Sequence, residues 1–135
     1  MYVLMGANGN ITSKAAKLLR AQGKSVRVVG RDGARMRALK DAGADLGIGD
    51  AKDAGFLAGV FRGADGVYAM IPPNYASPDH RAYQSAVGEA IAKAIVASGV
   101  KHVISLSSLG RVCPAAPGRS PACTTRKSAS RSWRA

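Results

Sequence analysis

This chain is poor in the residues that most often carry catalysis or bind metals. Its 135 residues include only two histidines and two cysteines, and aromatic residues make up 5% of it. The spacing of Cys113 and Cys123 matches no zinc or redox motif, and two cysteines do not make a disulfide framework. His80 and His102 stand alone, in no recognisable triad or metal set. No apolar run approaches the roughly 20 residues that cross a bilayer, so we expect a cytoplasmic protein without membrane contacts.

Acidic residues are also scarce, and their distribution limits what the positive charge means. The chain has 20 Lys and Arg against 8 Asp and Glu, a formal net charge of +12. Residues 1–110 hold 14 of the cations and every acid, whereas residues 111–135 hold 6 cations and no acid. That tail has one aromatic residue, Trp133, and the chain has no helix-turn-helix or RNA-binding signature. The pattern favours a solvated, disordered basic tail over a nucleic-acid interface.

The N-terminal stretch predicts a phosphate-binding turn. Residues 2–5 form an apolar run typical of a strand, and residues 13–22 have helical spacing. Between them, one glycine suits a tight turn, and a second lacks the side chain that would hold a pyrophosphate away from the backbone. The free N–H groups at the start of the helix would then face the anion. The residues expected to bind a dinucleotide here are Gly6, Ala7, Asn8, Gly9, Asn10 and Ile11.

This turn departs from the usual dinucleotide motif at two points. Its glycines are spaced Gly-x-x-Gly instead of Gly-x-Gly, and Thr12 stands where a third glycine permits close packing of helix on strand. Thr12 implies either a wider approach of helix and strand or a hydroxyl that caps the helix. An ordinary strand–helix turn is the alternative to a cofactor site, and the rest of the chain argues against it.

The chain alternates short apolar strands with helices. Strands are expected at residues 2–5, 25–30, 45–48, 66–71 and 102–106, and helices at residues 13–22, 34–42, 53–61 and 79–98. This alternation predicts an α/β fold, a doubly wound parallel sheet covered by helices on both faces. We expect the strand order 3-2-1-4-5, with a ligand crevice at the carboxyl ends of strands one and four. Residues 1–110 would form this domain.

Two strand ends carry charged side chains suited to the adenosine half of a dinucleotide. NAD-preferring folds place an acidic residue near the end of strand two, where it binds the ribose hydroxyls. Here Arg31 comes first and Arg35 follows one helical turn later, and cations there suit the 2′-phosphate of NADP. The alternative is a solvated pair of Arg31 and Asp32 at a helix start. Asp50, after strand three, either accepts from the adenine amino group or stabilises a turn.

The last two strand ends are candidates for the nicotinamide side. Paired prolines hold the chain extended after strand four, so Ile71 and Pro72 would pass over the cofactor's ribose and pyrophosphate. Tyr75 either faces the nicotinamide or lies on the surface. Ser107 and Ser108 close strand five, where they either bind a substrate carbonyl beside the nicotinamide or satisfy backbone groups.

Four segments together resemble the NmrA-like NAD(P)-binding proteins, a group of atypical short-chain dehydrogenase/reductases: residues 6–11, 28–31, 64–68 and 99–108. The resemblance covers about residues 1–110 and implies a Rossmann fold that binds NADP(H) or NAD(H). The family includes quinone, azo and isoflavone-type reductases and also redox-sensing regulators. Two departures limit what carries over. The proton-transferring Tyr-x-x-x-Lys pair is absent, because Val87 lies four residues after Tyr83, and no substrate-covering C-terminal region is recognisable.

Residues 111–135 are rich in Arg, Pro, Ala, Ser and Cys, which is typical of a GC-rich gene read out of frame. We hypothesise a frameshift just after Gly110, because codons that fit residues 118–126, displaced by two bases, spell Pro-Ile-Ala-Gly-Leu-His-Asp. Reading the gene across codons 108–126 tests this idea, which fails if no single insertion or deletion restores a family-like frame. A chain truncated there would leave the fifth strand with a bare edge, so we expect marginal stability and self-association into a homo-oligomer.

These patterns leave two main functions open. The first is an NAD(P)H-dependent reductase that acts on an unidentified small molecule by hydride transfer, or a truncated remnant of one. The second is a non-enzymatic redox sensor that passes the state of its dinucleotide to a protein partner. A third, nucleic-acid binding through the basic tail, depends on charge alone and would be abolished by deleting residues 111–135.

Overall fold

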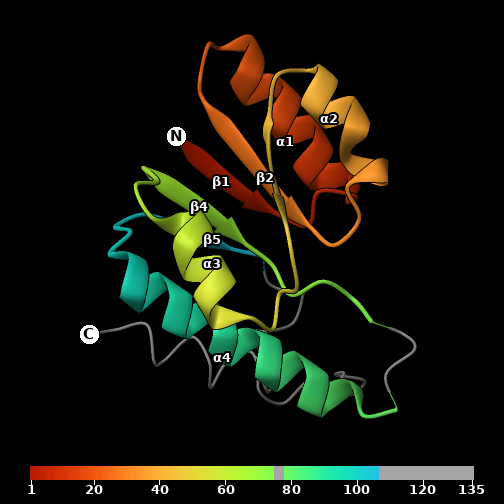
Figure 1. The fold of residues 1–135 in the computed structure, drawn as a ribbon, viewed down its shortest axis with the longest axis vertical. Coiled ribbons are helices and arrows are strands. Elements are labelled where there is room, and N and C mark those ends of the chain that lie inside the picture. Colours follow the sequence, from red (N-terminus) through yellow and green to blue (C-terminus); the bar gives the residue numbers. More distant parts are fainter. Residues whose placement is uncertain (75–77, 107–135) are drawn as a thin grey trace, which may run out of the picture.

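A computed structural model describes residues 1–74 and 78–106 of the chain. Five parallel strands form one sheet in the order β3-β2-β1-β4-β5, which confirms the expected doubly wound topology (Figure 1). The strands are β1 (Tyr2–Met5), β2 (Val26–Gly30), β3 (Asp45–Ile48), β4 (Gly66–Ala69) and β5 (Val103–Ser105). The helices are α1 (Asn10–Ala21), the short 3-10 helix η1 (Ala34–Met36), α2 (Arg37–Asp41), α3 (Ala54–Phe61) and α4 (His80–Ser98).

Two apolar clusters hold the helices on opposite faces of the sheet. Val3 and Met5 of β1 belong to the cluster beneath α3 and α4, with Leu57 fully buried among them. Leu4, between them in sequence, belongs to the cluster beneath α1 and α2, where it joins Ala16. Successive side chains of a strand point to opposite faces, so β1 contributes to both cores. Figure 1 shows the same arrangement, with α1 and α2 on one side of the sheet and α3 and α4 on the other.

Helix α1 begins three residues earlier than its apolar spacing predicts. The N–H of Gly9 donates to the carbonyl of Gly6 at 2.8 Å, which closes the turn after β1. The N–H of Ser13 then donates to the carbonyl of Gly9 at 3.0 Å, which is the first bond of the helix. Gly9 is therefore the N-cap, and no side chain caps this helix. The glycine turn runs directly into the helix without an intervening loop.

The segment predicted as one helix over residues 34–42 divides into η1 and α2. The carboxylate of Asp32 accepts from the N–H groups of Ala34 at 3.0 Å and Arg35 at 3.3 Å. The N–H of Met36 bonds back to the carbonyl of Gly33 at 3.1 Å. A hydrogen bond that spans three residues makes a tighter turn than an α-helix, so the first turn is 3-10.

Capping aspartates set the starts of α3 and α4, one residue later than predicted. Asp53 accepts from the N–H of Phe56 at 3.0 Å, and Asp79 accepts from the N–H of Ala82 at 2.8 Å. Such side-chain caps satisfy N–H groups that have no partner within the helix. Strand β4 ends at Ala69, two residues before its predicted end. Strands β2 and β5 are likewise shorter than predicted.

The described elements leave part of the sheet face that carries α1 and α2 uncovered. Tyr68 of β4 packs against the cluster on that face, but Ile104, its register partner on β5, is 72% exposed. Leu18 of α1 is also largely exposed. Self-association through such a surface stays a prediction. Within the described ranges, no helix is long and apolar enough to cross a bilayer.

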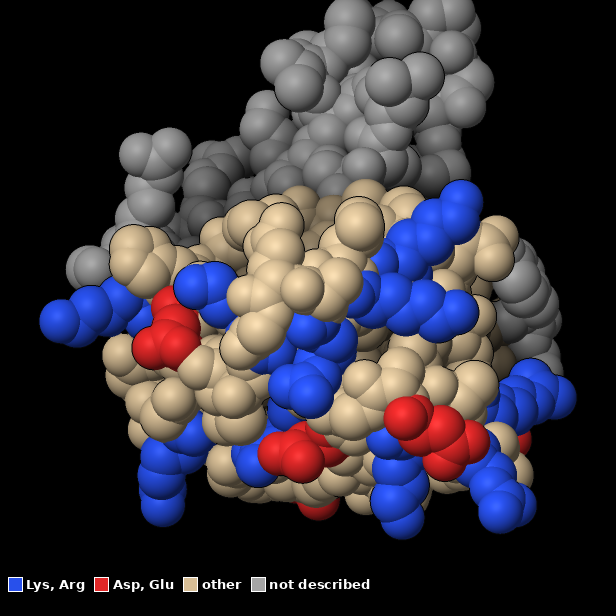
Figure 2. Space-filling model, turned by 90° about the horizontal axis from the view of Figure 1, so that it is seen from above, with Lys and Arg blue, Asp and Glu red and all other residues tan. Residues whose placement is uncertain are grey.

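Charged side chains of both signs share the end of the molecule that carries the C-terminal turn of α1. Figure 2 views the molecule from this end, and Lys and Arg outnumber Asp and Glu there. Acidic side chains lie among the basic ones. Positive charge on this face is therefore interrupted, unlike the continuous basic stripe that tracks a nucleic-acid backbone.

Candidate cofactor-binding site

The carboxyl ends of four strands open into one cleft of about 680 Å³. This volume lies within the roughly 300–1,000 Å³ range of small-molecule sites. The strand order reverses between β1 and β4, and the cleft lies at that switch point, where doubly wound sheets bind their ligands. The lining residues are Met5, Gly6, Ala7, Asn8, Gly9, Val29, Gly30, Arg31, Asp32, Arg35, Gly49, Ala51, Met70, Pro72 and Pro73.

The structure brings together most, but not all, of the residues expected at a cofactor. The cleft includes the turn residues Gly6, Ala7, Asn8 and Gly9, both arginines and Pro72. Four expected residues lie outside its lining: Asn10, Ile11, Asp50 and Ile71. Tyr75, Ser107 and Ser108, the expected catalytic residues, lie outside the described residues.

The glycine turn is fixed in place by its backbone. Gly6 has a φ of +78°, a conformation that favours glycine, and its N–H donates to the carbonyl of Val29 at 3.1 Å. Ala7 donates to the same carbonyl at 3.2 Å, so the end of β2 holds the turn. A Cβ on Gly9 would lie 3.2 Å from the carbonyl oxygen of Gly6, closer than most such contacts. The first N–H groups of α1 then follow, without partners inside the helix.

Thr12 does not have the capping role that its position in the sequence offered as one alternative, whereas the wider approach of helix and strand stays a prediction. Its hydroxyl does not cap α1, because Thr12 lies in the first turn and Gly9 is the N-cap. The hydroxyl instead donates to the carbonyl of Met5 at 2.9 Å, and the residue is 1% exposed. Thr12 thus joins the first turn of α1 to the last residue of β1. This hydrogen bond links the two elements that flank the glycine turn.

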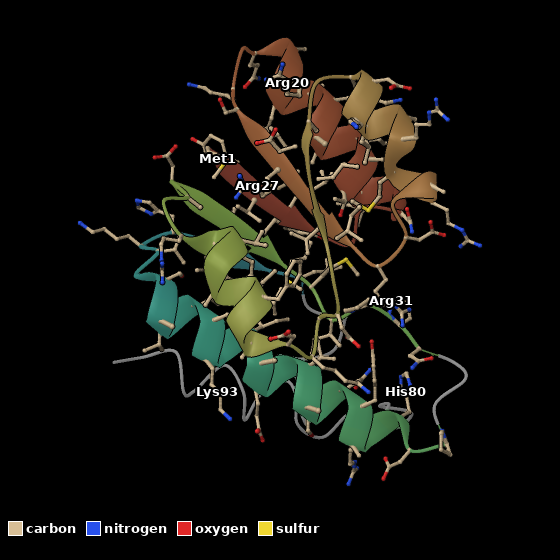
Figure 3. The ribbon with its side chains drawn as sticks, in the orientation of Figure 1. Met1, Arg20, Arg27, Arg31, His80 and Lys93 are labelled. Atoms are coloured by element: carbon tan, nitrogen blue, oxygen red, sulfur yellow. The ribbon has the colours of Figure 1, made fainter. Side chains whose placement is uncertain are left out.

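The two arginines of the cleft differ in their charge partners. Nε of Arg35 lies 3.3 Å from the carboxylate of Asp32, and both side chains are substantially exposed. The expected solvated pair therefore forms with Arg35 and not with Arg31. Arg31 projects from the carboxyl end of β2 and makes no ion pair within 4.0 Å in the described part of the chain (Figure 3). Among the described residues that line the cleft, Arg31 is therefore the cation that is not engaged in an ion pair.

Asp50 stabilises the turn that follows β3. Its carboxylate accepts from the N–H of Lys52 at 3.0 Å, and its carbonyl accepts from the N–H of Asp53 at 3.1 Å. This is the turn role that the sequence offered as one alternative. The neighbouring residues Gly49 and Ala51 line the cleft, whereas Asp50 does not. A bond from its carboxylate to adenine stays a prediction.

Two other expected residues lie at the margins of the site. The side chain of Ile11 is 57% exposed. Ile71 packs, partly buried, against the core beneath α3 and α4. Neither residue lines the cleft, so their contact with a cofactor stays a prediction.

A buried tyrosine of α4 contacts a lysine that the sequence pattern did not pair with it. Tyr83 of α4 is 6% exposed, and Nζ of Lys52 lies 5.1 Å from the centre of its ring. Burial raises the pKa of its phenol, the charge of Arg31 lowers that pKa, and the charge of Asp50 raises it. A lysine thus reaches Tyr83 from the loop after β3, not from the fourth residue along the same helix. No local spacing could have revealed this contact, because the fold creates it.

Several solved structures that resemble this chain are reductases or hold a bound dinucleotide. A triphenylmethane reductase from Citrobacter sp. superposes with a TM-score of 0.82 at 17% identity, over 98% of this chain and 44% of that one. An NADPH-dependent quinone oxidoreductase from Escherichia coli, complexed with NADPH, gives 0.75 at 16% identity, over 97% and 44%. A short-chain dehydrogenase/reductase superfamily protein from Agrobacterium tumefaciens with bound NAD gives 0.77 at 21% identity, over 98% and 43%. The chain spans less than half the length of each, and at these identities the likeness shows the fold.

The sequence itself places the chain in a family. A search of curated protein sequences finds no match to it. The model of the NmrA-like family matches residues 2–125, which extends past residue 110, where we expected the resemblance to end. The matched span covers nearly the whole chain, so the chain belongs to the NmrA-like family.

Proposed function

We propose that the cleft binds NADP(H), with the pyrophosphate on the glycine turn and the 2′-phosphate at Arg31. The observation that carries this proposal is the continuity of three features in one cleft: a turn bounded by two glycines, the N-terminus of α1 and the guanidinium of Arg31, which has no ion pair among the residues that the structure describes. Backbone N–H groups at a helix start attract phosphate. A guanidinium suits a phosphate dianion because it donates two parallel hydrogen bonds. NAD(H) would use the same turn but not the contact with Arg31.

The chain would then serve as the cofactor-binding part of an NAD(P)H-dependent reductase of the quinone or azo type. A reduced nicotinamide, when bound, supplies a hydride. This chain's own residues would hold and orient it: Met70 and Pro72 form the wall where the ring would lie. The reductases among the similar structures support this class of reaction.

A specific observation favours the non-enzymatic alternative, a redox sensor. The titratable side chains that line the cleft, within the described ranges, are Arg31, Asp32 and Arg35, and all three belong to its adenosine side. None of them can move a proton beside a nicotinamide. A sensor needs only different affinities for oxidised and reduced dinucleotide, and a partner that responds to the difference.

Titration of the purified chain with NADPH and with NADH, followed by nicotinamide fluorescence, tests the proposal. We expect saturable binding of both, tighter for NADPH. Absence of saturable binding would refute the cofactor site. Steady-state oxidation of NADPH in the presence of a quinone then separates the two functions, because a sensor binds the dinucleotide but produces no turnover.

A further inference from the structure

A methionine sulfur lies directly on the phosphate-binding turn. Met70 follows β4, is half-buried and lines the cleft. A Cβ placed on Gly6 would overlap Sδ of Met70, and would lie 3.1 Å from its Cγ and 3.3 Å from its Cε. The thioether thus occupies the space that the missing side chain of Gly6 leaves open. Any group added to this sulfur changes the shape and polarity of the turn.

The other methionines are placed differently. Met5 is 2% exposed and Met36 is fully buried, so an oxidant in solvent cannot reach either sulfur without unfolding. Met1 lies at the opposite end of the strands, where its amino group pairs with Asp65. Of the four methionines in the chain, Met70 alone is both partly exposed and part of the cleft. A thioether with solvent access is the kind that peroxides oxidise.

We propose that Met70 is a site of reversible oxidation that controls dinucleotide binding. The inference depends on the proposed function of the cleft. In the reaction, a lone pair on Sδ attacks one oxygen of hydrogen peroxide, a new S–O bond forms and the O–O bond breaks. The departing hydroxide takes the remaining peroxide proton and leaves as water. The sulfur is oxidised by two electrons to a sulfoxide, and the peroxide is reduced.

The expected consequence is weaker binding. A sulfoxide converts a flexible apolar side chain into a polar one with a partly negative oxygen. Against Gly6, that oxygen would lie beside the anion that the turn is built to hold, and would repel it. The reverse linkage also holds, because a dinucleotide seated on the turn covers the sulfur. Bound NADPH should therefore slow oxidation of Met70.

The test combines peptide mass mapping with NADPH titration of the full chain before and after limited exposure to hydrogen peroxide. We expect Met70 to gain one oxygen atom before Met5 and Met36 do. NADPH affinity should then fall about tenfold, which corresponds to the loss of one good polar contact. Methionine sulfoxide reductase should restore the affinity. Added NADPH should slow oxidation at Met70 but not at Met1.

Two variants separate this effect from oxidation elsewhere. Met70→Leu keeps both cysteines and a side chain of similar volume, and its affinity should survive peroxide. Met36→Leu, a buried control, should stay as sensitive as the parent chain. The inference would be overturned if Met70→Leu lost affinity after peroxide, or if a chain oxidised at Met70 kept its affinity. Either result would leave the proposed function intact. Failure of the untreated chain to bind NADPH would overturn the proposed function as well.

Discussion

The two walls of the cleft present different chemical groups to a ligand. The wall built from β1, α1 and the end of β2 offers backbone N–H groups, a turn bounded by two glycines and the charges of Arg31, Asp32 and Arg35. The wall after β4 offers Met70 and two prolines, with no charge. The first wall is suited to recognise phosphates, and the second to hold an uncharged ring and to react with oxidants. Substitutions in the first wall should therefore change affinity directly, and substitutions in the second wall should change how affinity responds to oxidants.

The largest effect is expected where the two walls touch, at Gly6. Gly6→Ala adds a Cβ that collides with Met70, and it also costs about 1–2 kcal/mol of stability for a positive φ. NADPH binding should weaken more than about 100-fold, or ~2.7 kcal/mol, because the Met70 side chain must shift and the positive φ of the turn becomes strained. Calorimetric titration measures the binding, and thermal unfolding measures the stability.

Gly63→Ala is the matched control for that change. Gly63 has a φ of +74°, but a Cβ there would meet no atom within 4 Å. It should lose similar stability and keep its affinity for NADPH. Equal affinity losses in the two variants would show that folding, not the contact between the walls, sets the binding.

The next effect should distinguish the two arginines of the first wall. Arg31→Ala should weaken NADPH binding about 10- to 100-fold, since hydrogen bonds to charged groups contribute ~1.5–3 kcal/mol, and leave NADH binding nearly unchanged. Arg35→Ala should change either affinity much less, because Asp32 already pairs with that guanidinium in solvent. Fluorescence titration with both dinucleotides measures this. A larger loss in Arg35→Ala would reverse the assignment.

A smaller effect is expected beneath the first wall, at Thr12. Thr12→Val keeps the shape but removes the buried bond to the carbonyl of Met5, so the free energy of unfolding should fall by about 1–2 kcal/mol. Ser13→Ala is the control, because its hydroxyl donates to the carbonyl of Asn10 at the surface, and it should cost under about 0.5 kcal/mol. Urea unfolding compares the two. Equal costs would contradict a special role for the joint between α1 and β1.

The smallest effect is confined to alkaline pH. Burial raises the pKa of Tyr83 above its usual value, so the folded chain favours the neutral phenol. That stabilisation is complete below the unfolded pKa of about 10 and is lost as pH rises through the folded pKa. Tyr83→Phe should unfold like the parent chain at pH 8 but lose less stability above pH 10. A parallel decline of both chains in urea would contradict this.

The sequence predicted the backbone of the site better than its side-chain contacts. Strand order and the glycine turn follow from apolar periodicity and from glycines at a strand end, which are local signals. The contact of Lys52 with Tyr83 and the position of Met70 over Gly6 depend on how helices and loops pack. Thr12 illustrates this limit of sequence-based prediction. Its hydrogen bond to Met5 could be predicted only if the start of α1 were already known. The expected catalytic residues and the tail lie outside the described residues.

The most direct measurement is a titration of the ¹⁵N-labelled chain with NADP⁺, followed by the amide signals in a two-dimensional NMR spectrum. If the first wall holds the pyrophosphate, the amides of residues 6–12 and 30–35 should shift together and saturate at one dinucleotide per chain. The amides of residues 99–102, at the other end of the sheet, should stay unchanged. Saturable shifts confined to that other end, or no shifts at all in a folded chain, would contradict dinucleotide binding in this cleft.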